Sequence, residues 1–143
     1  MGRAGQILSR WMARAGFESD EEFRRFTYIA AMMRCFPGRS PKGSGDRPPP
    51  AAAVRNCSSW MEAELELLRP PVIIPVGQLA IRRFLGPGPL EERVGQTFGD
   101  RPLFVPLPHP SGQSRWLNDL ANREHLEAAL ARIGELRRRL LGR

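Results

Sequence analysis

The stretch "VIIPVGQLAIRRFL", residues 72–85, contains a strand, a turn and a helix in immediate succession. Residues 72–76 form a short, fully apolar run, which is typical of a strand buried on both faces. Gly77 then turns the chain directly into residues 78–85, which we expect to be helical. A buried strand that leads straight into a helix is the building unit of a parallel sheet covered by helices. This stretch therefore predicts an α/β protein.

The segments on either side continue the alternation of strands and helices. Ser19 and Glu22 have the spacing of a capping box, which marks the start of a short helix. Further helices are predicted over residues 3–15, 51–69 and 120–140, and further strands over residues 26–33, 93–98 and 103–107. The pattern predicts a three-layer α/β/α fold with a short, mainly parallel central sheet. We expect residues 1–143 to form a single domain that contains a Gly/Pro/Ser-rich loop over residues 36–50.

The composition indicates a globular protein. The chain has 143 residues, and 41% of them are hydrophobic, which is enough for a real core. No apolar run approaches the length of a membrane span, and the N-terminus lacks the features of a signal peptide. The two cysteines do not suggest a secreted disulfide scaffold. We expect a cytoplasmic monomer that does not bind membranes.

The charge is strongly positive, with a formal net charge of +7. Lys42 is the sole lysine, so arginine supplies nearly all of the basic residues. Because arginine binds phosphate through two parallel hydrogen bonds and stacks on bases, a polyanionic partner is one interpretation. A GC-rich genome, which favours arginine codons, is the other.

The loop "PLPHPSGQSRWLND", residues 106–119, carries the most distinctive chemistry. Its prolines exclude a regular helix. A histidine, two serines and an arginine follow directly after the predicted strand 103–107. In parallel sheets, ligands bind at the carboxyl ends of the strands, so we expect this loop to line a site, together with the loop after strand 26–33. The chain contains no P-loop, dinucleotide fingerprint, HExxH or CxxC motif.

An ordered series of motifs resembles the uracil-DNA glycosylase superfamily. "LPHPSGQSRW" is similar to its second signature, in which a strand ends in His-Pro-Ser. "YIAAMMRCFPG" and "CSSWMEAELELLRPPVIIPVGQLAIRRFLG" resemble segments of its bacterial iron–sulfur branches, and the order holds from about residue 2 to residue 131. The resemblance implies a base-excision repair enzyme that hydrolyses the N-glycosidic bond of a flipped-out uracil or related deaminated base. Its partner would be DNA, single- or double-stranded.

The resemblance also implies roles for the residues of the loop. His109 would be the catalytic residue, donating a hydrogen bond to the departing base. Ser111 would hold a DNA phosphate, and Gln113 falls where the family has a wedge that fills the space of the flipped base. The implied DNA-binding residues are Ser111, Gly112, Gln113, Ser114 and Arg115. Trp116 either buttresses this loop or packs in the core, and we expect His125 on the last helix to face solvent.

The base pocket implied by the resemblance includes Ala31 and Met32. Ala31 stands where the family, in the branches that have it, places an asparagine that recognises uracil. An apolar residue there cannot form two hydrogen bonds to the base edge, so we expect a broader or altered base preference.

Cys35 and Cys57 match positions that bind a [4Fe–4S] cluster in the iron–sulfur branches. Such a cluster needs four thiolates, whereas this chain has two cysteines. We expect the cluster if further cysteines lie upstream, and otherwise no cofactor. The alternative is a helix cysteine at Cys57 and a free thiol at Cys35.

The first signature of the family, Gly-x-Ala-Pro-Gly, is missing from this chain. In the family it carries the group that positions the attacking water. The opening "MGRAGQIL" resembles "VGRAGQLL", which follows that signature, so we expect either a start codon assigned too late or a truncated protein without the N-terminal strand. The alternatives to an enzyme are a non-catalytic DNA-binding relative and a gene fragment that lacks the water-activating motif.

Overall fold

A computed structural model of the chain describes residues 2–32, 38–43, 47–111 and 115–143. It divides into two compact units, which we describe separately. The first unit comprises residues 1–28 and 71–143, and the second comprises residues 29–70. The prediction of a single domain over residues 1–143 stays a prediction.

A two-stranded parallel sheet forms the centre of the first unit. Strand β1 (Val72–Ile73) pairs with β2 (Leu103–Phe104), with Val72 opposite Leu103. The ladder continues beyond the named strands, because the amide of Leu107 donates to the Pro75 carbonyl at 2.9 Å and the amide of Gly77 donates to the Leu107 carbonyl at 2.9 Å. Pro75 has no N–H to donate to Val105, which explains why the regular pairing is interrupted between the two ends.

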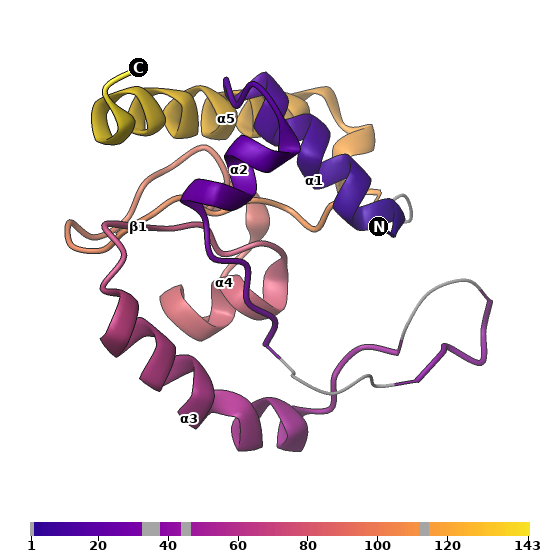
Figure 1. Ribbon diagram of the computed structural model, residues 1–143. Helices are drawn as coiled ribbons and strands as arrows, with labels where there is room; N and C mark the ends of the chain where they lie inside the picture. Colours follow the sequence, from indigo (N-terminus) through magenta and orange to yellow (C-terminus); the bar gives the residue numbers. More distant parts are fainter. Residues whose placement is uncertain (1, 33–37, 44–46, 112–114) are drawn as a thin grey trace. The chain divides into compact units, whose positions relative to one another are not determined.

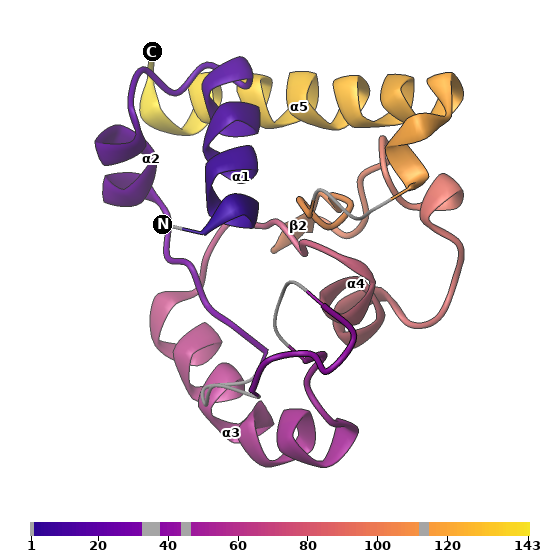
Figure 2. The same cartoon turned by 90° about the vertical axis from the view of Figure 1, so that its right-hand side faces the viewer.

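Helices cover both faces of this sheet. The first unit contains α1 (Arg3–Arg14), α2 (Asp20–Phe26), α4 (Gln78–Leu85) and α5 (Leu120–Leu141). Val105 and Leu107 are fully buried in one core with residues of α1, α2 and α5. Phe104 points to the opposite face, as alternation along a strand requires, and its ring lies 5.5 Å from Phe84 of α4. In Figures 1 and 2, α4 and α5 lie on opposite sides of the strands. The predicted α/β/α layering is confirmed.

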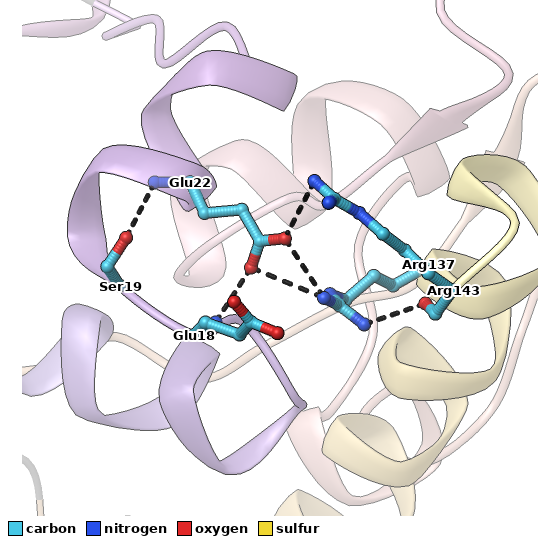
Figure 3. A network of polar contacts seen from close by, with 5 residues as sticks. All are labelled: Glu18, Ser19, Glu22, Arg137 and Arg143. Atoms are coloured by element: carbon cyan, nitrogen blue, oxygen red, sulfur yellow. Dashed lines mark hydrogen bonds and ion pairs between the residues drawn. The ribbon is translucent and has the colours of Figure 1, made fainter.

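The start of α2 confirms the capping box in part. The Ser19 hydroxyl accepts a hydrogen bond from the Glu22 amide at 3.0 Å. The Glu22 carboxylate accepts from the amide of Glu18 at 2.7 Å, one residue earlier than the amide of the capping residue itself. The same carboxylate also reaches arginines near the end of α5 (Figure 3).

The predicted strand over residues 26–33 is wrong for the residues that the structure describes. Helix α2 extends to Phe26, and residues 27–32 form neither helix nor strand. Tyr28 and Ile29 are 60% and 53% exposed, whereas a central strand would bury such side chains. A strand is stable when a neighbouring strand pairs with its backbone. Within the described ranges the sheet consists of β1 and β2, so residues 27–32 do not take part in it. Met33 lies outside the described residues.

The predicted strand over residues 93–98 is also wrong. A short 3₁₀ helix, η1 (Leu90–Glu92), leads into a turn, and Gly95 adopts a φ of +91°, which no strand can accommodate. Val94 is fully buried, so its apolar character serves the core rather than a sheet. Phe98 keeps a single antiparallel bridge to Phe104.

The second unit contains α3 (Ala51–Leu68), which confirms the predicted helix. Met61 is buried on its apolar stripe, and Cys57 is half-buried. Within the predicted loop 36–50, the described residues form no helix and no strand longer than one bridge. Considering both units, the described chain has no helix that combines the length and the apolar character needed to cross a membrane.

Candidate functional site

The end of β2 is a buried, proline-rich segment that presents one exposed histidine. Pro106 and Pro108 are fully buried, and Pro110 is buried as well, whereas His109 is exposed. Each proline fixes its own φ angle, so the backbone on both sides of His109 has little freedom. The imidazole is therefore held at the surface by a rigid support.

The His109 side chain lies against the start of α4. Gly77 is the N-cap residue of α4, and a Cβ atom built on it would lie 3.1 Å from Cδ2 of His109. Gly77 follows β1, and His109 follows β2. The structure thus brings His109 to the carboxyl ends of both parallel strands, where ligands bind in α/β sheets.

The other end of the loop is tied to the first turn of α5. It runs into a 3₁₀ helix, η2 (Trp116–Asn118). The Asn122 side-chain amide donates to the Trp116 carbonyl at 2.8 Å, and the Arg123 Nε donates to the Leu117 carbonyl at 2.7 Å. The Trp116 indole N–H donates to Glu91 Oε1 at 3.0 Å. Buried prolines thus fix one end of the histidine-bearing loop (residues 106–115), and the buried Asn122 together with hydrogen bonds from the exposed Arg123 and to the exposed Glu91 fixes the segment at its other end.

Trp116 and His125 have packing roles. Trp116 is partly buried and packs against the hydrophobic core, which favours the packing interpretation of this residue. His125 is half-buried, and its ring centroid lies 6.4 Å from that of Trp116. The expectation that His125 faces solvent therefore holds in part, because Trp116 and the close approach of Gly95 cover one side of a residue that keeps some exposure.

The remaining predicted site residues fall in three places. Ser111 is half-buried and Arg115 is exposed, and both belong to the histidine-bearing loop. Gly112, Gln113 and Ser114 lie outside the described residues, as does Cys35. Ala31, which is exposed, Met32 and Cys57 belong to the second unit. His109, Ser111 and Arg115 thus belong, by their place in the sequence, to the segment between β2 and η2.

Sequence reasoning missed three residues that shape this site. Gly77 was recognised as a turn, but its contact with His109 was not foreseen. Asn122 and Glu91, which hold Trp116, gave no signal in the sequence beyond ordinary polar character. A buried asparagine within an otherwise amphipathic helix can be recognised only when the partner of its amide is known.

The described residues do not fit an iron–sulfur cluster. Cys57 is a half-buried free thiol on α3, and the described part of the chain holds no group of three or more histidine, cysteine or acidic residues that could bind a metal. The 143-residue sequence has two cysteines, whereas the cluster takes four thiolates, so a cluster would need further cysteines.

Comparison with known proteins identifies the family. The model of the uracil DNA glycosylase superfamily matches residues 1–134, so this chain belongs to that superfamily. It is 41% identical over 61 residues to the type-5 uracil-DNA glycosylase of Pyrobaculum aerophilum, covering 43% of this chain and 24% of that protein. It is 25% identical over 146 residues to the type-4 uracil-DNA glycosylase of Archaeoglobus fulgidus, covering 95% of this chain and 66% of that protein. The chain thus spans a quarter to two thirds of the length of these relatives.

Proposed function

We propose that this chain acts in base-excision repair as a glycosylase of the uracil-DNA glycosylase type. Its substrate would be a uracil or related deaminated base that has been flipped out of DNA. The observation that carries the proposal is His109, an exposed imidazole on a rigid proline-rich turn at the carboxyl ends of both strands. Many ligands can bind at the carboxyl ends of parallel strands. Membership of the superfamily supports a flipped-out DNA base as the ligand here.

The chemistry assigned to His109 is stabilisation of a departing anion. When the bond between C1′ of the sugar and the base nitrogen breaks, the bonding electrons stay with the base and negative charge develops on its oxygen. A neutral imidazole can donate its N–H to that oxygen. A water molecule adds to C1′ and loses a proton to solvent, and the departing base anion takes up a proton from solvent. Because the flanking prolines are buried, the backbone that carries this donor needs little reorganisation as the charge develops.

Contacts to the DNA backbone are assigned to the rest of the loop. The Ser111 hydroxyl and the Arg115 guanidinium can both donate to phosphate oxygens. Gly112, Gln113 and Ser114, which join them in sequence, are proposed as DNA-binding residues on the resemblance of the motif. Ala31 and Met32 are proposed for the base pocket on the same grounds, and the apolar Ala31 favours a broader choice of base than uracil alone.

The test is excision from an oligonucleotide that carries one uracil, in single- and double-stranded form, with hypoxanthine as a second deaminated base. Abasic product is revealed by alkaline cleavage. We expect His109→Ala to lower the excision rate by about 100- to 1,000-fold, since loss of one such donor costs this much in enzymes, while the affinity for DNA is retained. His125→Gln is the matched control, because it removes the other imidazole of the chain. Equal rates for the wild type and His109→Ala would reject the role of His109.

A second candidate function is DNA binding without catalysis. The net charge of +7 and the exposed Arg115 are as consistent with simple DNA binding as with a glycosylase. The same assay separates the two functions, because binding without excision of either base by the wild-type chain would support the non-catalytic relative.

A further inference from the structure

Gly77 makes an unusually close approach to the proposed catalytic histidine. The three heavy atoms nearest to a Cβ built on Gly77 all belong to the His109 side chain: Cδ2 at 3.1 Å, Cβ at 3.5 Å and Cγ at 3.7 Å. The first of these distances is shorter than ordinary contacts of a Cβ atom, so the imidazole occupies the space that any other residue at position 77 would need.

The backbone of Gly77 is itself firmly held. Its amide donates to the Leu107 carbonyl at 2.9 Å, and its carbonyl accepts from the Ile81 amide at 3.0 Å. Gly77 therefore joins the end of the strand ladder to the first turn of α4, and its partner Leu107 lies two residues before His109 in the chain. The Cβ–Cγ–Cδ2 edge of the exposed His109 side chain thus lies next to a fixed, buried backbone.

We propose that Gly77 is a positioning residue that sets the orientation of the His109 imidazole. The two flanking prolines restrict the backbone of His109, but they leave its side-chain torsions free. Gly77 supplies the missing restraint, because its lack of a side chain lets the Cβ–Cγ–Cδ2 edge of His109 lie close to the backbone in the present orientation. The catalytic consequence rests on the function proposed for His109, whereas the contact between the two residues does not.

The decisive variant is Gly77→Ala, and the chain offers a matched control at the other end of the same helix. Gly77 has φ +87° and ψ 162°, and Gly86 has φ +79° and ψ −179°. Both lie in a region of backbone angles that is open to glycine alone, so alanine is strained at either position. A Cβ on Gly86 would meet no atom within 4 Å, so Gly86→Ala reproduces the backbone strain without the clash.

We expect Gly77→Ala to lower kcat for excision by about 3- to 10-fold with KM nearly unchanged, because the ring must move by a few tenths of an ångström and a displacement of about 1 Å costs roughly 100-fold. Gly86→Ala should change kcat less than about twofold, while both variants lower the melting temperature. The His109→Ala variant removes the ring and leaves a contact of 3.5 Å between Cβ of residue 77 and Cβ of residue 109, which is an ordinary distance. In this background Gly77→Ala should therefore cause no further loss of activity. An equal loss of kcat in Gly77→Ala and Gly86→Ala, or an additive loss in the double variant, would overturn the proposal.

A measurement on the unaltered chain removes any dependence on the folding of the variants. We expect a strong nuclear Overhauser effect between an α-proton of Gly77 and the Hδ2 proton of His109, and its absence would refute the contact. If the wild-type chain excises neither base, the proposed function fails, but the nuclear magnetic resonance signals of the His109 ring protons still test the positioning inference. Gly77→Ala should shift these signals, and Gly86→Ala should leave them in place. Unchanged ring signals in Gly77→Ala would reject the inference.

Discussion

Glu22 of α2 and Arg137 of α5 form an ion pair that is almost completely shielded from water. Two nitrogen–oxygen contacts of 3.1 and 3.2 Å join the carboxylate to one guanidinium nitrogen, and the side chains are 10% and 9% exposed. The Arg137 guanidinium also lies 5.3 Å from the centre of the Phe17 ring. Arg143 approaches the same carboxylate at 3.2 Å (Figure 3). The pair thus fastens the N-terminal helices to the last turns of α5.

We expect Arg137→Met to lower the unfolding midpoint by several degrees. Methionine keeps the packing against Phe17, but it leaves the Glu22 charge with fewer partners in a shielded position, and such charges are costly. Thermal unfolding checks this prediction. Arg132→Met is the control, because Arg132 pairs with Glu135 at 2.9 Å on an exposed part of the same helix. Exposed pairs contribute little, so equal effects of the two substitutions would contradict the prediction.

The contribution of Glu22 should depend on pH. The amide of Glu18 and, after it, the guanidinium of Arg137 lower the pKa of Glu22 below its ordinary value of 4.5, although burial opposes this shift. A carboxyl group with a lower pKa in the folded state stabilises the protein above its unfolded pKa, and this stabilisation is lost as the pH falls through the folded pKa. The difference in unfolding free energy between the wild type and Glu22→Gln should therefore be constant near neutral pH and shrink below about pH 4.5. Chemical denaturation at pH 7 and at pH 3 measures it, and an equal difference at both pH values would argue against the assigned role.

Asn122 should be important for the stability of the histidine-bearing loop. It is 8% exposed, and Asn122→Ala would remove the donor to the Trp116 carbonyl. We expect a loss of about 1–3 kcal/mol in the free energy of unfolding, as is typical when a buried polar group loses its partner. Asn118→Ala, at an exposed position of η2, is the control and should have a much smaller effect. A loss of the same size in both variants would mean that the hydrogen bond is not the cause.

Arg115 should contribute to DNA binding through charge. We expect Arg115→Ala to weaken binding uniformly across sequences and to reduce the slope of log K against log salt by about one, because one phosphate contact is lost. Fluorescence anisotropy in a His109→Ala background measures this without turnover. Arg139→Ala, on the exposed last turn of α5, removes the same charge elsewhere. If both variants reduce the slope equally, the effect is one of net charge and not of the loop.

The failed strand predictions have a common physical cause. Residues 26–33 are rich in apolar and aromatic side chains, and residues 93–98 include Val94, Thr97 and Phe98. Such side chains occur in strands and in irregular segments alike. Whether such a segment becomes a strand depends on a partner strand elsewhere in the chain, and local sequence does not contain that information. At residues 93–98 the turn is stable because Gly95 tolerates a positive φ and Val94 fills the core.

The sequence by itself determined the segments whose structure is set locally. The apolar run 72–76 followed by Gly77, the capping box at Ser19 and the periodic helices all depend on neighbouring residues. The predicted ends of the helices lie within one residue of those observed, whereas the strand predicted over residues 72–76 is regular over Val72–Ile73 alone. The prolines around His109 likewise fixed that segment as a loop. The tertiary structure alone decided which segments meet: Gly77 with His109, Asn122 with Trp116, and Glu22 with Arg137 across 115 residues of chain. These contacts arise because packing the helices on the two faces of the sheet brings distant residues together, and no local preference encodes such a meeting.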